Sequence, residues 1–171
     1  MADKRIGIVG GIVVVLAAVV AYRVLTPHQA AQDALVSVGR GVITDVGTVT
    51  VIHAGVSPET VDYDGKTVQA GAGHQYVLLD CRIEAPSQDV DFDDFQLVRD
   101  RAPLGHEVNV GNHADAGYFY WTYLDASGRP AGQTLATAKA FIARLSFKVP
   151  SDVPSAYLFY WGLYWGPFEL H

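Results

Sequence analysis

The stretch FIARLSFKVP, residues 141–150, alternates apolar and mostly polar side chains at every second position. Successive side chains of a β-strand point to opposite faces of its sheet, so a period of two predicts a strand with one buried face. The stretch QYVLLDCRIEA, residues 75–85, shows the same alternation. The apolar sets are Phe141, Ala143, Leu145, Phe147 and Val149 in the first stretch, and Val77, Leu79, Cys81 and Ile83 in the second.

Shorter segments repeat these strand signals and are bounded by turn residues. They are residues 46–53, 95–98, 118–124, 156–161 and 163–168. Turns are predicted at Asp62–Gly65 and at Asp125–Pro130, where aspartate, glycine and proline gather. Several short strands without a long amphipathic helix predict an all-β fold, an immunoglobulin-like two-sheet sandwich over residues 41–171. A jelly roll is the alternative topology, because the number of strands does not separate the two.

The amino-terminal sequence predicts a membrane-spanning segment. Residues 6–22 (IGIVGGIVVVLAAVVAY) carry no charge, and as a helix they would extend about 25 Å. Residues 1–25 are therefore predicted to form one N-terminal transmembrane helix, and residues 26–40 a juxtamembrane linker or short helix. Lys4 and Arg5 precede the span, which favours a single-pass membrane protein with an extracytoplasmic carboxy-terminal domain. The alternative is a signal peptide cleaved after Val19-Val20-Ala21.

The composition excludes several classes of protein. The chain has 171 residues, which allows one folded domain of ordinary size beside the apolar segment. Its formal net charge of −6, from 12 basic and 18 acidic residues, argues against binding to nucleic acid. Cys81 is the single cysteine, so an intrachain disulfide and a multi-cysteine zinc site are excluded.

Hydrophobic and turn positions of the chain resemble a known family. The positions are 73–80 (GHQYVLLD), 94–97 (DFQL), Gly132, Leu135, 145–150 (LSFKVP) and 157–160 (YLFY). Over roughly residues 47–160 they are similar to the telokin-like lipoprotein domain family. The resemblance implies an exported immunoglobulin-like sandwich, and it brings no catalytic residues. Members often carry an acylated cysteine after a signal sequence, and here the predicted transmembrane segment stands in that place.

Two polar clusters are candidates for metal binding. Asp89, Asp91, Asp93 and Asp94 lie in the sequence DVDFDD, which lacks the glycine and the glutamate of a helix-loop-helix calcium loop. A solvated acidic loop is the favoured interpretation. The second cluster, His106, Glu107, His113 and Asp115, offers only two imidazoles, so exposed loop histidines are favoured there. The sequence therefore predicts neither a metal nor another cofactor.

No motif of nucleophilic catalysis is visible. The sequence contains no Gly-x-Ser-x-Gly elbow, and Cys81 lies on the apolar face of its strand, where a thiol is usually inert. The chain is therefore predicted not to be an enzyme. A metal-dependent enzyme built on His106 and His113 is the least supported alternative.

The aromatic residues predict a binding surface. Of 19 aromatic residues, 12 lie in the segments 118–123 and 157–168. Consecutive aromatics on a strand point to both faces, so Tyr160 is predicted to project outward and to be joined by Trp121 and Trp165. The first hypothesis is a structural or protein-binding subunit of a cell-envelope or virion surface assembly. The second is a glycan-binding module in which Trp121, Trp161 or Trp165 stacks on a sugar.

Overall fold

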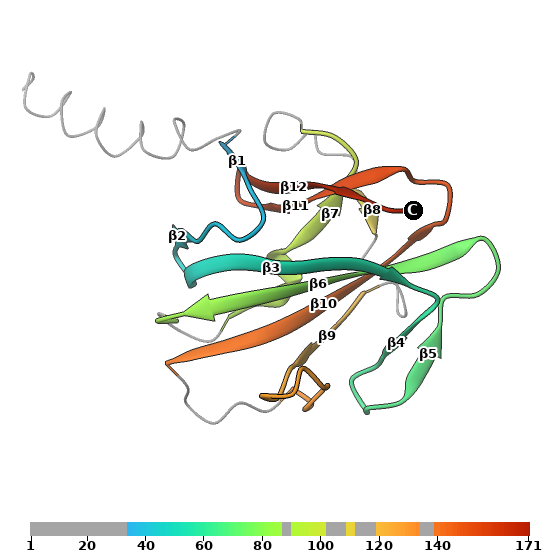
Figure 1. Ribbon diagram of the computed structural model, residues 1–171, viewed down its shortest axis with the longest axis horizontal. Coiled ribbons are helices and arrows are strands. Elements are labelled where there is room, and N and C mark those ends of the chain that lie inside the picture. The colour runs from blue at the N-terminus through green and yellow to red at the C-terminus, as the bar shows by residue number, and fades with distance from the viewer. Residues whose placement is uncertain (1–33, 87–89, 102–108, 112–118, 134–138) are drawn as a thin grey trace, which may run out of the picture.

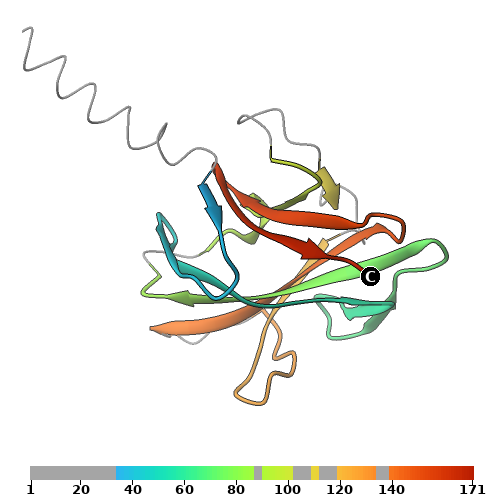
Figure 2. The same cartoon turned by 45° about the horizontal axis from the view of Figure 1, so that its top comes forward.

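The computed structural model describes residues 34–86, 90–101, 109–111, 119–133 and 139–171. In this part of the chain two five-stranded sheets lie face to face, with a two-stranded hairpin beside them (Figure 1). Figure 2 shows the two layers after a turn of the molecule. The protein is therefore a β-sandwich, as its sequence predicts.

We name the two sheets after a central strand of each. The β6 sheet has the order β2 (Val42–Thr44), β3 (Gly47–Ser57), β6 (His74–Glu84), β10 (Ala140–Pro150) and β9 (Phe119–Tyr123). The β11 sheet has the order β1 (Ala34–Val36), β12 (Leu163–Glu169), β11 (Ser155–Tyr160), β7 (Gln96–Val98) and β8 (Asn109–Gly111). The separate hairpin consists of β4 (Glu59–Val61) and β5 (Thr67–Gln69), and a short 3-10 helix, η1 (Phe92–Asp94), precedes β7.

Seven of these strands have the order of an immunoglobulin domain. Along the chain they are β3, β6, β7, β9, β10, β11 and β12. In space they lie as β3-β6-β10-β9 in one sheet and as β12-β11-β7 in the other. Lettered A to G along the chain, they give the ABED and GFC sheets of immunoglobulin sandwiches. This order favours the immunoglobulin-like topology over a jelly roll.

The two most regular strands meet at the centre of the β6 sheet. Strand β10 pairs with β6 along its whole length, from Ala140 opposite Glu84 to Pro150 opposite His74. Their inward side chains are completely buried between the sheets: Val77, Leu79, Cys81, Ile83, Ala143, Leu145, Phe147 and Val149. The predicted faces of both strands are thus confirmed.

Aspartate side chains hold the two predicted turns. The Asp62 carboxylate accepts hydrogen bonds from the backbone N–H groups of Asp64 (3.0 Å) and Lys66 (2.8 Å). The Asp125 carboxylate likewise accepts from the N–H groups of Ser127 (2.8 Å) and Arg129 (3.0 Å). An aspartate that bonds to its own backbone a few residues on favours a tight turn, and both predicted turns are confirmed.

The predicted fold class needs one correction, which concerns the helix. The described residues contain no α-helix, and no helix among them is long and apolar enough to cross a membrane. Within the described residues the fold class is therefore an all-β sandwich, with no membrane-spanning helix. Residues 1–25, for which the sequence predicts a transmembrane helix, lie outside the described residues.

The sandwich also begins earlier in the chain than its sequence predicts. Residues 34–36, assigned to the linker or short helix, form strand β1, which runs parallel to β12. Val36 is buried in the core, where it lies opposite Trp165 in the strand pairing. Three residues are too few for an alternating pattern to be visible, so this strand depends on its pairing with β12 rather than on a local signal.

The register of β10 predicts the outcome of one matched pair of substitutions. Leu145→Asp should abolish folding, with a loss above about 4 kcal/mol in the free energy of unfolding, because the carboxylate would be buried without a partner. Ile43→Asp makes the same aliphatic-to-acid change on a strand, at a side chain that is 84% exposed, and should cost less than about 1 kcal/mol. Urea unfolding of the full chain measures both. Equal losses in the two variants would show that the inward face of β10 is misassigned.

Candidate functional site

The structure places Tyr160 in the core, which overturns the prediction that its side chain projects outward. The side chain is 2% exposed, and its ring stacks on Phe95 with 4.5 Å between the ring centroids. Its hydroxyl donates a hydrogen bond of 2.7 Å to Oδ1 of Asp45, in the turn between β2 and β3. The inward set of β11 is therefore Ala156, Leu158 and Tyr160, and the predicted parity of this strand is wrong.

Trp165 and Trp121 do not form the predicted surface either. Trp165 lies opposite Leu158 in the β11–β12 pairing and is completely buried in the same core. Trp121 is partly buried and packs on that core, with its ring 4.7 Å from the ring of Phe92. Of the three residues predicted to bind a partner, two are core residues and one lies at the margin of the core.

The outer face of the β11 sheet carries aromatic side chains, but they are covered as well. Phe159 and Tyr164 form a second, smaller apolar cluster with Val98, and Tyr157 packs against it. Phe159 is 5% exposed and Tyr164 is completely buried. These rings therefore offer a partner no open surface, although they do lie outside the main core.

Trp161 is the most exposed aromatic residue in the described part of the chain. It is 62% exposed at the tip of the β11–β12 hairpin, where Trp161 and Gly162 are the two loop residues. Both have positive φ angles, +43° and +88°, as a type I′ turn requires. Asparagine and glycine suit such positions, whereas a bulky side chain is strained there. Strain at an exposed residue points to a functional role.

The surroundings of Trp161 are acidic. Its indole Nε1–H donates a long hydrogen bond of 3.4 Å to Oδ2 of Asp94, in η1. Asp45 and Asp91 lie near the preceding residue, Tyr160, whose hydroxyl bonds to the first and whose pKa is raised by the charge of the second. Burial, the hydrogen bond to Asp45 and the charges of Asp94 and Asp91 raise the pKa of Tyr160. We call Trp161, Asp45, Asp91 and Asp94 the tip surface.

The predicted metal candidates have other roles or lie elsewhere. The Asp91 side chain caps η1 by accepting a hydrogen bond of 3.0 Å from the N–H of Asp93. Among the described residues no group of three potential ligands comes together. Asp89 lies outside the described residues, as do His106, Glu107, His113 and Asp115. Cys81 is buried as predicted, and burial raises the pKa of its thiol.

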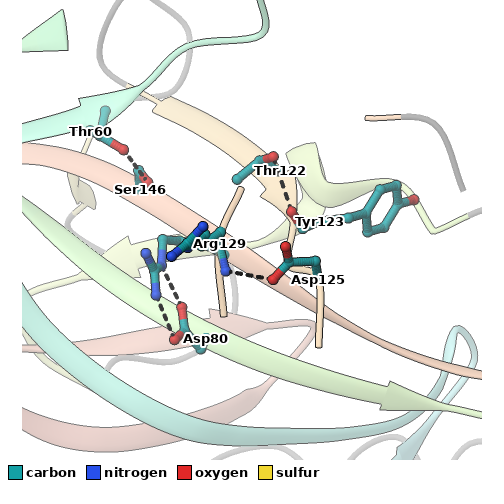
Figure 3. Close-up of polar contacts among 8 residues, drawn as sticks. Thr60, Asp80, Thr122, Tyr123, Asp125, Arg129 and Ser146 are labelled. Atoms are coloured by element: carbon teal, nitrogen blue, oxygen red, sulfur yellow. Dashed lines mark hydrogen bonds and ion pairs between the residues drawn. The ribbon is translucent and has the colours of Figure 1, made fainter. Parts of the chain in front are cut away.

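A polar layer lies on the outer face of the β6 sheet, beneath the β4–β5 hairpin. Its buried polar side chains are Thr60, Asp80, Thr122 and Ser146. Across the β6–β10 pairing, Arg144 donates to Asp80 through Nε (2.7 Å) and Nη2 (2.9 Å), and Figure 3 shows both bonds of this bidentate ion pair at the labelled Asp80 carboxylate. Thr60 donates a hydrogen bond of 2.7 Å to Ser146 in the same view. The sequence does not reveal this layer, because an outward polar residue on a strand usually means exposure.

A pocket of about 250 Å³ opens at this layer. It is lined by Ser57, Glu59, Thr60, Val61, Thr67, Leu78, Thr122, Pro130 and Arg144. The walls come from the hairpin, from four neighbouring strands and from the turn after β9, so residues far apart in the sequence meet there.

Comparison with known proteins adds little beyond the fold. No protein-family model matches the chain, and no curated protein matches it. Among solved structures, an uncharacterized β-sandwich protein from Clostridium difficile 630 is similar with a TM-score of 0.49 and 13% sequence identity. The match covers 78% of this chain and 92% of that chain.

The ion pair of the polar layer should contribute more to stability than an exposed pair. The side chains of Arg144 and Asp80 are 24% and 10% exposed, and those of Lys66 and Asp64 are 74% and 73% exposed. Asp80→Asn should cost about 2 kcal/mol, because it leaves a partly buried guanidinium without its counter-charge. Asp64→Asn is the matched control and should have no measurable effect. Chemical denaturation measures the free energy of unfolding of both variants. An equally small loss in the two would show that the Arg144–Asp80 pair does not stabilise the fold.

The buried tyrosines predict a loss of stability in alkali. Burial and the neighbouring Tyr120 raise the pKa of Tyr76 to about 12 from an ordinary value of 10.0, so the folded state favours the neutral ring. This stabilisation is complete below pH 10 and is lost as the pH rises towards 12. The melting temperature should therefore fall between pH 10 and 12, and Tyr76→Phe should weaken the dependence. Ionisation of every tyrosine near pH 10 in the folded protein, seen by ultraviolet absorbance, would contradict the prediction.

Proposed function

We propose that this chain is a protein-binding β-sandwich module, a structural subunit of a larger assembly, which contacts its partner through the tip surface. The observation that carries the proposal is Trp161 itself, an exposed indole held at a positive φ angle in a two-residue loop. A single exposed apolar residue is ordinary on a protein surface. An exposed tryptophan in a conformation that costs energy is not ordinary, since nothing in the core requires it there.

The chemistry of the tip surface indicates the kind of partner. Tryptophan is the residue most enriched among those that dominate binding energy at protein interfaces. Asp94 contacts the indole of Trp161. Asp45 and Asp91 lie near the adjacent Tyr160, and all three aspartates are exposed. A lysine or arginine of the partner would meet these charges and the face of the indole ring together, which combines ion pairing with a cation–π contact. We therefore propose a partner that presents basic side chains, bound more weakly as the salt concentration rises.

Membership in the telokin-like lipoprotein domain family is part of the same proposal. It is supported by the hydrophobic and turn positions between residues 47 and 160, and by a strand order in which β6 and β10 occupy the central B and E positions. The resemblance implies an exported domain, so we also propose an extracytoplasmic location. Placement in a cell-envelope or virion surface assembly stays a prediction from the sequence.

Crosslinking in the native cell tests the proposal most directly. A photo-reactive phenylalanine analogue at position 161 should crosslink to one partner in defined stoichiometry, whereas the same analogue at the exposed position 56, near the far end of β3, should not. The crosslinked protein is then purified for binding measurements with the full chain. Crosslinks that are equally diffuse at both positions would show that the tip is not a contact surface.

Trp161→Asn then separates binding from folding. Asparagine suits a positive φ angle, so the variant should keep or slightly raise the melting temperature. Loss of the indole should weaken binding to the purified partner by about 30-fold, the effect of a residue that dominates an interface. Val56→Ala is the control, since it trims an exposed aliphatic side chain near the end of β3 that lies farther from Asp45. If Trp161→Asn lowers the melting temperature strongly and the folded variant binds normally, the tryptophan is structural.

A further inference from the structure

We propose that the pocket on the outer face of the β6 sheet binds a neutral polyhydroxylated ligand of about the size of one sugar ring. This goes beyond the proposed function, because the pocket lies on the outer face of one sheet, whereas Trp161 ends a hairpin of the other. The pocket also differs from the sugar platform that the sequence predicted, since no aromatic side chain lines it.

The first reason is the polarity of a buried contact. Strands β6, β9 and β10 turn their apolar side chains inward, so Asp80, Thr122 and Ser146 point outward towards the hairpin and the turn that cover them. An element that only has to cover a sheet does so best with apolar side chains, because a buried polar group stabilises the fold little even when it is paired. Here the covered layer places hydroxyl groups and an ion pair beside the buried ring of Tyr76 and Leu78, and this share of polar groups suits polar recognition better than packing alone.

The second reason is that the polar groups are already held in place. Thr122 accepts a hydrogen bond of 3.1 Å from the N–H of Gly132, and its hydroxyl lies 3.2 Å from the carbonyl oxygens of Tyr123 and Gly132. Thr60 is fixed by its bond to Ser146. A ligand that enters the pocket therefore meets oriented groups and loses little additional side-chain freedom.

The charges of the pocket define the class of ligand. Asp80 takes two of the five N–H donors of Arg144, which leaves three for a ligand, and it neutralises the guanidinium charge. Glu59 adds an exposed carboxylate at the pocket wall. An anion would meet this carboxylate without a free positive charge to offset it, so the pocket favours a neutral ligand that both accepts and donates hydrogen bonds.

The remaining walls and the volume narrow the class further. Val61, Leu78 and Pro130 supply an apolar part beside the hydroxyl groups of Ser57 and Thr67. A sugar ring has the same division, with C–H groups on its faces and hydroxyl groups around its edge. The volume of about 250 Å³ lies just below the range of about 300–1,000 Å³ that is usual for drug-sized ligands, so it suits a single ring.

Nuclear magnetic resonance of the full chain, labelled with nitrogen-15 and carbon-13 methyl groups, tests the proposal. The probes are glucose, galactose and mannose, each added up to about 100 mM, with inorganic phosphate and glucuronate as anionic probes. At least one hexose should shift the Leu78 and Val61 methyl signals with a dissociation constant on the order of millimolar. No shift with any hexose, or tighter binding of phosphate or glucuronate, would overturn the proposal.

A pair of isosteric variants then locates the binding. Thr67→Val removes one hydroxyl from the pocket wall and keeps the β-branched shape, and it should weaken hexose binding by about 3- to 10-fold. Thr48→Val makes the same change on β3, a strand of the β6 sheet, at a residue that does not line the pocket. This variant should leave the affinity for the hexose unchanged. Trp161→Asn should also leave it unchanged, which keeps this result separate from the proposed function. Equal weakening by Thr67→Val and Thr48→Val would place the hexose elsewhere and overturn the proposal.

Discussion

The ladder between β6 and β10 is the constraint on which the rest of the structure depends. It pairs eleven residues of each strand without interruption, and β3 and β9 add to its two sides. Because side chains alternate, one register fixes both faces: Leu79 and Leu145 enter the core while Asp80 and Arg144 point outward. A slip by one residue would expose the apolar set and bury the charges. The ion pair thus penalises the wrong register, which is a role in specificity rather than a large gain in stability.

The two-residue loop at Trp161 and Gly162 sets the register of the other sheet. It places Tyr160 opposite Leu163 and Leu158 opposite Trp165, so the large rings of Tyr160 and Trp165 fill the core. A bulge follows in β12, where Gly166 adopts a φ of +129° and a Cβ atom would lie 3.1 Å from the carbonyl oxygen of Ala156. The extra residue shifts the alternation of β12 by one position, so Phe168 points into the core as Trp165 does. A glycine is required at the bulge, whereas at the loop tip a tryptophan stands where its backbone is strained.

The sequence predicted the parts of the fold whose faces differ in polarity. Strands β6 and β10 each have one apolar, buried face and one mostly polar face, which leaves an alternating pattern in the sequence. The two aspartate turns are held by hydrogen bonds within a few residues, so they also leave a local signal. Strand β11 has apolar clusters on both faces, so its alternation carries no information, and Tyr160 was placed on the wrong side. A bulky residue before Gly162, between two apolar runs, could have marked Trp161 as a loop residue. The polar pocket leaves no local signal, because its walls come from segments that are far apart in the sequence.

Both candidate sites lie outside the main core, and they use different parts of the chain. The tip surface joins the β11–β12 loop to η1 and to the β2–β3 turn, whereas the polar layer joins the β4–β5 hairpin to the outer face of the β6 sheet. Apolar side chains of similar volume in place of Asp80 and Arg144 would be expected to stabilise a sheet face that serves only as a contact. The same reasoning applies to asparagine or glycine at position 161. At each site the sequence therefore keeps a residue type that stability alone would not select; register gives one reason for the ion pair, and the proposed recognition of another molecule would account for both.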